Sequence, residues 1–158
     1  MDGNFVEHSG EQFMEQALTE ARMAMTAGEV PVGAIVVSAE GEVVGRGSNR
    51  PISSNDPTGH AEIVAIRSAA EQLGNYRLAG ATLYCTLEPC VMCAGAIVHA
   101  RIARVVFGAR DPRAGAAGSI YNVLTDTRLN HQPEVVEGVR EPECRKLLQE
   151  FFEWKRRS

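Results

Sequence analysis

The run Val32–Ser38 restricts the fold more than any other part of the sequence, because nearly every position in it is apolar and none is charged. A strand with one face in water alternates apolar and polar residues, whereas a strand covered on both faces reads as a continuous apolar run. Residues 39–41 then predict a hairpin turn, and residues 42–47 predict a second strand beside the first. Gly45 and Gly47 in this second strand indicate a bulge or a close backbone approach. We therefore expect a sheet with helices on both faces.

The rest of the chain alternates predicted helices and strands. Ser9 and Gln12 form a capping box that predicts the start of a first helix, and Gly28 predicts its end. Asp56-Pro57 predicts the start of a second helix, which Gly74 ends. The later predicted elements are, in order, a strand at 81–85, a helix from Pro89 to Ala100, strands at 104–108 and 135–136, and a helix from Pro142. This order predicts a single α/β domain over residues 1–158, with three layers, α/β/α, and a mixed five-stranded sheet.

Charge and hydropathy restrict the location and the partners. The N-terminal residues have neither a basic start nor an apolar core, so no secretory signal is expected. The uncharged runs 30–39 and 89–100 are shorter than the roughly 20 apolar residues of a membrane span. We therefore expect a cytoplasmic protein with no membrane contact. The net charge of −4 gives no overall attraction to nucleic acid. A polyanion partner would need local basic clusters, and the candidates are Arg101 with Arg104, Arg110 with Arg113, and residues 155–157.

Cys90 and Cys93 are spaced for a metal or redox site. Both follow Pro89 at a predicted helix start, where residues three apart lie on one face and the helix N-terminus stabilises thiolates. In the cytoplasm such a pair is more often a metal site or a redox pair than a disulfide, and two buried structural cysteines are a further alternative. His60, near another predicted helix start, adds a third ligand, and one His with two Cys suits zinc. Three protein ligands plus water is the catalytic zinc pattern, whereas a structural site closes with four.

Two other cysteines and one carboxylate bear on this hypothesis. Cys85 and Cys144 are interpreted as core residues, although ligation by Cys85 would close the site and weaken the enzyme interpretation. Glu62 lies two residues after His60, which on a regular helix separates the side chains by roughly 200°. Both face one cavity only if the first turn is irregular or if the ligand lies along the axis. A carboxylate there would accept the proton of a zinc-activated water.

Several segments resemble a known family. His60-Ala61-Glu62 together with Pro89-Cys90-Val91-Met92-Cys93 resembles the zinc-dependent nucleoside and nucleobase deaminases. From Glu29 onward the chain is similar to bacterial tRNA adenosine deaminases, which implies a cytidine-deaminase-like fold. The similar segments are residues 30–34, 47–50, 86–96, 107–111 and 115–119. The two short motifs identify only the superfamily, and the last two segments are the more specific to the tRNA enzymes.

The resemblance implies a complete reaction. His60, Cys90 and Cys93 would hold one zinc per chain, and the activated water would attack C6 of adenine while Glu62 carries the proton. The product would be inosine at the wobble position, 34, in the anticodon stem-loop of an arginine tRNA, and the enzyme would be a homodimer. Asn49 matches a family position that contacts the target nucleoside. Asp111 matches a loop position near the substrate's backbone, and its alternative interpretation is a turn residue before Pro112.

Three other functions stay open on the sequence. The nearest is a zinc-dependent deaminase of a small free substrate, such as guanine or cytidine. The second is a zinc-stabilised binding protein without catalysis, which would also bind metal through these residues. The third is a dithiol redox protein, an interpretation that leaves His60 and Glu62 unexplained.

Overall fold

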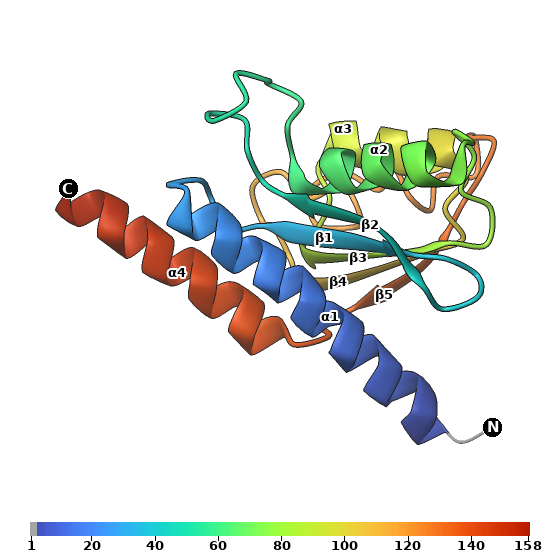
Figure 1. Ribbon diagram of the computed structural model, residues 1–158, viewed down its shortest axis with the longest axis horizontal. Coiled ribbons are helices and arrows are strands. Elements are labelled where there is room, and N and C mark those ends of the chain that lie inside the picture. Colours follow the sequence, from blue (N-terminus) through green and yellow to red (C-terminus); the bar gives the residue numbers. More distant parts are fainter. Residues whose placement is uncertain (1–2) are drawn as a thin grey trace.

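A computed structural model describes the backbone of residues 3–158 and the side chains from Gly10 onward. The elements are α1 (Gly3–Thr26), β1 (Gly33–Val37), β2 (Val43–Ser48), α2 (Ala61–Leu73), β3 (Thr82–Leu87), α3 (Val91–Ala100), β4 (Arg104–Ala109), β5 (Glu134–Glu137) and α4 (Glu141–Arg157). The five strands form one sheet in the order β2-β1-β3-β4-β5 (Figure 1). The predicted five-stranded α/β fold is therefore confirmed. None of the described helices combines the length and the apolar character that a membrane crossing requires.

The sheet is mixed, as predicted. β1 is antiparallel to both β2 and β3, whereas β3, β4 and β5 run parallel. The crossover from β3 to β4 is made by α3, and the crossover from β4 to β5 is made by residues 110–133 without a helix. A connection of this length inside a compact fold is uncommon and is usually functional.

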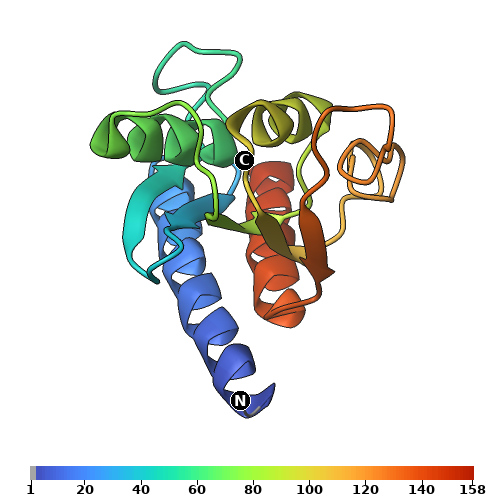
Figure 2. The same ribbon diagram turned by 90° about the vertical axis from the view of Figure 1, so that its right-hand side faces the viewer.

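Helices cover both faces of the sheet. α2 and α3 lie on one face, and α1 and α4 lie on the other (Figures 1 and 2). All five residues of β1 are buried. Ala34 and Val36 belong to the core beneath α2 and α3, whereas Ile35 and Val37 belong to the core beneath α1. The continuous apolar run thus becomes a central strand with a core on each side.

The glycines of β2 bring α2 close to the sheet. A Cβ atom at Gly45 would lie 2.3 Å from the carbonyl oxygen of Ala65, and one at Gly47 would lie 2.2 Å from that of Ala61. Only glycine fits such an approach. The register also shifts between Val36 and Val37, so β2 carries a bulge as well. The predicted bulge and the predicted close backbone approach are therefore both present in β2. The close contact places the start of α2 against this edge strand of the sheet.

Two predicted helix starts are wrong. α1 begins at Gly3, so Ser9 lies inside this helix and is not its N-cap; residues 3–8 contain no proline, and a nucleated helix extends until a stop signal. α2 begins at Ala61 and not at Asp56-Pro57. The Asp56 carboxylate instead accepts hydrogen bonds from the backbone N–H (2.8 Å) and the hydroxyl (2.7 Å) of Thr58, which makes a local turn.

The other predicted boundaries lie close to the observed ones. Gly74 ends α2 in a left-handed conformation, with φ of 64°, as its C-cap role predicts. α3 begins at Val91, two residues after Pro89, and α4 begins at Glu141, one residue before Pro142. The short edge strand predicted at 135–136 is β5.

Candidate active site

The first turns of α2 and α3 carry the predicted metal ligands in equivalent positions. His60 is the N-cap of α2, and Cys90 is the N-cap of α3. Both have extended backbones, with φ and ψ of −70° and 150° at His60 and −77° and 177° at Cys90. Their carbonyl oxygens already accept the first helical hydrogen bonds, from Val64 (3.0 Å) and Ala94 (2.8 Å). Each ligand therefore lies at a positive helix end, which favours a thiolate or another anion nearby.

The extended conformation of His60 answers the geometric question that the sequence left open. His60 precedes the helix, whereas Glu62 lies in its first turn. The angle of roughly 200° between side chains two residues apart holds only when both lie in the helix, so it does not separate His60 from Glu62. Glu62 is almost completely buried, at 4% exposure, and the Cys93 thiol and the His60 imidazole both influence the pKa of its carboxyl group. The structure thus brings this carboxylate beside the candidate ligands.

His60, Cys90 and Cys93 form one compact cluster. The Nδ1 atom of His60 lies 3.5 Å from Sγ of Cys90 and 3.6 Å from Sγ of Cys93. All three candidate ligand atoms lie within 4.8 Å of one another. Zinc bonds of about 2.1 Å to nitrogen and about 2.3 Å to sulfur, at a tetrahedral angle, separate these atoms by about 3.6 Å. The three donors therefore fit a tetrahedral zinc ion.

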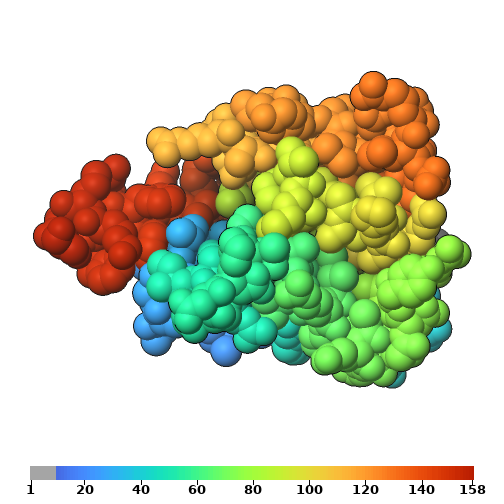
Figure 3. All heavy atoms as spheres, turned by 90° about the horizontal axis from the view of Figure 1, so that it is seen from above, coloured from blue at the N-terminus to red at the C-terminus, as the bar shows by residue number. Residues whose placement is uncertain are grey.

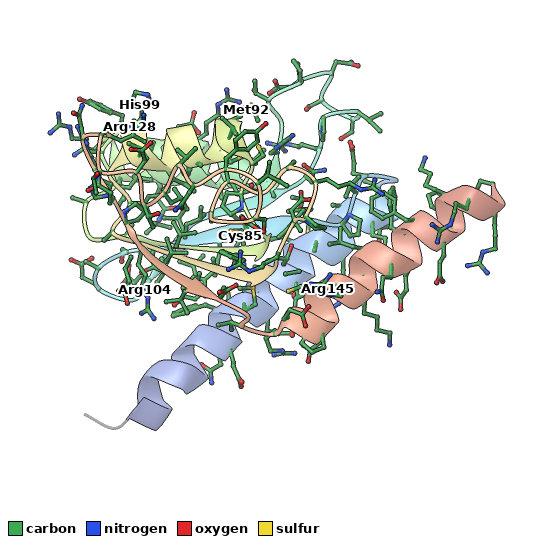
Figure 4. The ribbon with its side chains drawn as sticks, turned by 180° about the vertical axis from the view of Figure 1, so that it is seen from behind. Cys85, Met92, His99, Arg104, Arg128 and Arg145 are labelled. Carbon is green, nitrogen blue, oxygen red and sulfur yellow. The ribbon has the colours of Figure 1, made fainter. Side chains whose placement is uncertain are left out.

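The two remaining cysteines lie apart from this cluster. Cys85 is fully buried in β3, where its thiol points to the carbonyl oxygen of Val106 at 3.8 Å (Figure 4). Cys144 is buried under β4, where a Cβ atom at Gly108 would lie 2.3 Å from its Sγ. Both are core residues, as predicted. Among the residues that the structure describes, the cluster has three protein ligands, which is the number typical of a catalytic zinc site.

Hydrogen bonds with Cys90 shift the pKa values of the three candidate ligands. A hydrogen bond from the Cys93 thiol lowers the pKa of Cys90 to about 4, against the opposing effect of burial. The pKa of Cys93 is raised because this proton is held by Cys90 and because the thiol is buried. The hydrogen bond with Cys90 also raises the pKa of His60. Since metal ligands must be deprotonated, metal binding would displace the protons of Cys93 and His60.

Glu62 has the properties of a proton carrier. Burial raises the pKa of its carboxyl group, and the hydrogen bond from Cys93 and the charge of His60 oppose this rise. A buried carboxyl group with a raised pKa is suited to accept a proton and to return it. The arrangement can therefore combine three metal donors with an acid–base group.

The two predicted substrate residues line different hollows. Asn49 follows β2, and its backbone N–H donates to the carbonyl oxygen of Val32 (3.0 Å). It lines a hollow of about 650 Å³, and its side-chain amide makes no hydrogen bond to any residue in the part of the chain with described side chains. Asp111 lines a groove of about 950 Å³ beside α4. Its carboxylate accepts from the backbone N–H groups of Arg113 (2.9 Å) and Ala114 (3.2 Å), so it also acts as the alternative turn residue.

Sequence reasoning missed two buried carboxylates that hold the loops around the cluster. Glu29 accepts from the backbone N–H groups of Ile52 (3.3 Å) and Ser53 (2.7 Å), in the loop that follows Asn49. Glu88 holds the loop after β4. The only signal in the sequence was a glutamate beside an apolar segment in each case, and such residues are mostly exposed.

The fold and the cluster define a zinc-dependent deaminase domain. Residues 7–109 match the family model described as the cytidine and deoxycytidylate deaminase zinc-binding region. The chain belongs to this family, which confirms the resemblance drawn from its motifs.

Individual relatives are more specific. The tRNA-specific adenosine deaminase of Haemophilus influenzae is 49% identical over 146 residues, which are 92% of this chain and 84% of that protein. A solved structure from a study of A-to-I editing by tRNA:A34 deaminases at the wobble position of transfer RNA is 49% identical, with a TM-score of 0.84 over 87% of this chain and 99% of that one. A guanine deaminase structure from Nitrosomonas europaea is 25% identical, with a TM-score of 0.78 over 89% of this chain and 83% of that one.

Proposed function

We propose that this chain hydrolyses the wobble adenosine, position 34, of a tRNA to inosine and ammonia. The choice of substrate depends on one observation: tRNA-specific adenosine deaminases are 49% identical to the chain over about 90% of its length. A guanine deaminase of Nitrosomonas europaea is 25% identical over a similar share, and one of Bacillus subtilis is 43% identical but over only 68% of the chain, with a TM-score of 0.62. The choice of reaction is supported by the cluster, in which three zinc donors and a buried carboxylate lie together.

We propose a separate role for each residue of the cluster. His60, Cys90 and Cys93 would hold one zinc per chain, which would make a water molecule nucleophilic near neutral pH. Glu62 takes a proton from the attacking water and passes it to N1 of the adenine ring. It then assists the departure of ammonia, so that the C6–N bond breaks as the new C6–O bond is retained. The buried position of Glu62 keeps this proton from bulk water.

The groove beside α4 suits the RNA. It lies between the loop that contains Asp111 and the projecting end of α4, which flank the same side of the molecule (Figure 3). Three of its cations, Arg113, Lys155 and Arg156, form no ion pair with the residues whose side chains are described. Phe152 adds an exposed aromatic ring beside them. Cations beside an aromatic surface are typical of single-stranded nucleic-acid sites, so we assign the phosphates of the anticodon stem-loop to this groove.

Asn49 and Asp111 would contact the flipped nucleoside and its flanking backbone. The amide of Asn49 has both a donor and an acceptor available for a nucleoside. We also infer that an arginine tRNA is the substrate and that the enzyme is a homodimer. Val91 and Met92, in the first turn of α3, support the dimer because they expose 48% and 36% of their surface although the next residue, Cys93, is buried. Figure 4 shows Met92 on α3. Apolar side chains beside an active site are typical of a contact surface.

An anticodon stem-loop RNA with adenosine at the wobble position tests the proposed function. The zinc-loaded protein should convert this adenosine to inosine, detected by mass analysis of the nucleosides, and should leave free adenosine unchanged. The same RNA with guanosine at that position is the matched control. Turnover of free guanine or cytidine, with the stem-loop unchanged, would overturn the proposal in favour of a small-substrate deaminase.

A further inference from the structure

Glu88 is a buried carboxylate whose partners all come from one loop. It is 2% exposed and lies between the end of β3 and Cys90. Oε1 accepts from the backbone N–H of Asp111 (3.0 Å) and from the hydroxyl of Ser119. Oε2 accepts from the backbone N–H groups of Ala117 (2.9 Å) and Ser119 (3.1 Å). No cation pairs with Glu88 among the residues with described side chains, so these four donors compensate for its burial.

The loop 111–119 wraps closely around this carboxylate. A Cβ atom at Gly115 would lie 2.4–2.5 Å from the carboxylate atoms of Glu88, so the loop can pass only because this residue is glycine. The backbone continues the contact on both sides, since Ala116 N–H donates to the carbonyl oxygen of Pro89 (2.8 Å) and Glu88 N–H donates to that of Ala109 (2.8 Å). The loop has no helix or named strand of its own: turn hydrogen bonds at Asp111 and an isolated bridge between Ala117 and Asn122 shape it locally, and Glu88 fastens it to the segment before Cys90.

The same short segment holds the metal ligand Cys90. Glu88 and Cys90 are separated only by Pro89, whose ring fixes its backbone φ angle. A loop that is held by Glu88 is therefore held at a fixed position relative to the cluster. Asp111, at the start of the loop, lines the groove beside α4, so this position also sets one wall of the groove.

We propose that Glu88 is a positioning residue, which holds loop 111–119 in the conformation that receives the RNA beside the metal cluster. This inference rests on the proposed function for its substrate. Selection of the RNA would then depend on Glu88, which holds the loop, as well as on the loop residues that face the RNA. Glu88 itself would touch neither the RNA nor the metal, because each of its carboxylate oxygens already accepts two hydrogen bonds from the loop.

The substitution Glu88→Gln separates positioning from stability. It keeps the shape of the side chain but replaces one accepting oxygen with an amide that faces two donors. We expect KM for the stem-loop to rise roughly tenfold or more, with kcat lowered less than KM is raised and with unchanged zinc content. Glu40→Gln, in the exposed hairpin between β1 and β2, is the matched control and should leave KM unchanged. An unchanged KM in Glu88→Gln, or a loss confined to thermal stability, would overturn the inference.

Hydrogen exchange gives a second readout that does not need turnover. In the zinc-loaded protein, Glu88→Gln should speed exchange at the N–H groups of Asp111, Ala117 and Ser119, with little change in β1. Ser119→Ala removes one donor and should give a smaller rise in KM, and the double variant should be less than additive. If wild-type protein leaves the RNA unchanged, the proposed function fails, but the exchange data still decide whether Glu88 holds the loop. Unchanged exchange would overturn that anchoring role.

Discussion

His60 lies in extended backbone just before α2, and Glu62 lies two residues later in the first turn of that helix. This relationship places an imidazole and a carboxylate of neighbouring sequence beside the same pair of cysteines. The N-cap position of Cys90 repeats the arrangement on α3. Two helix starts, held on one face of a sheet, are therefore sufficient to bring together three candidate zinc donors and a candidate acid–base group.

Glu62→Gln should abolish deamination while the zinc content stays at the wild-type level. The amide keeps the size of the side chain but cannot carry the proton between water and adenine, and general acid–base groups typically contribute 10²- to 10⁴-fold in rate. Single-turnover assays on the stem-loop, with metal analysis of the same sample, measure both quantities. Glu40→Gln, at an exposed position in the hairpin between β1 and β2, is the control. Normal turnover in Glu62→Gln would show that the proton is carried by another group.

Removal of a cluster thiol should remove the metal. Cys90→Ser and Cys93→Ser should each lower the zinc content well below the wild-type level, because a hydroxyl is a poor substitute for a thiolate at a zinc ion. Cys85→Ser is the control, since its buried thiol contacts the carbonyl oxygen of Val106 and is not among the three clustered ligand atoms. Elemental analysis after dialysis measures the result. Loss of zinc in Cys85→Ser would contradict the three-ligand site.

The clustering of His60, Cys90 and Cys93 was predictable from the sequence because residue type and spacing indicate their chemistry. Their geometry was not. The backbone of His60 becomes extended because α2 starts at Ala61, while the earlier candidate start at Asp56 is occupied by a local turn with Thr58. α2 begins where it packs closely on Gly45 and Gly47 of β2, and this contact is not a local feature of the sequence around Asp56.

The central strand was predictable for a different reason. Successive side chains of a strand point to opposite faces, so a continuous apolar run is buried only if a hydrophobic core covers each face. β1 has one such core on each face. The anchoring roles of Glu29 and Glu88 could not be predicted in the same way. Their donors lie 23 to 31 residues away in sequence, in loops without periodic patterns, so neither the burial of these glutamates nor their partners can be read locally.

Glu29 should make stability depend on pH in the acid range. Its hydrogen bonds from Ser53 and Ile52 lower the pKa of the carboxyl group below its usual 4.5, despite burial. A depressed pKa stabilises the folded state above the unfolded-state pKa, and this stabilisation is lost as pH falls through the folded-state value. In Glu29→Gln the slope of stability against pH below about pH 4.5 should therefore be smaller than in the wild type. Urea unfolding between pH 3 and pH 7 measures this difference, and equal slopes would contradict it.

Gly47→Ala should destabilise the protein and disturb the site. The new Cβ atom would lie 2.2 Å from the carbonyl oxygen of Ala61, which is backbone and cannot rotate away. Overpacking of this kind costs about 1–3 kcal/mol, and here the strain falls on the residue that follows His60. Gly10→Ala is the matched control: it lies in α1 with no atom within 4 Å of the new Cβ, and should stabilise by up to about 1 kcal/mol. Thermal unfolding compares the two, and a neutral Gly47→Ala would refute the close approach.

Lys155→Ala should reduce the salt dependence of RNA binding if the groove beside α4 holds phosphates. Each phosphate contact with single-stranded nucleic acid contributes a slope of about −0.7 to the plot of log K against log salt concentration, so the slope should become shallower by about this amount. Lys146→Ala, on the same helix but paired with Glu150 and outside the groove, is the matched control. Binding of the stem-loop to the Glu62→Gln protein at several salt concentrations separates affinity from turnover. Equal slopes for the two lysine variants would place the phosphates elsewhere, whereas a shallower slope for Lys155→Ala alone would assign one phosphate to the end of α4.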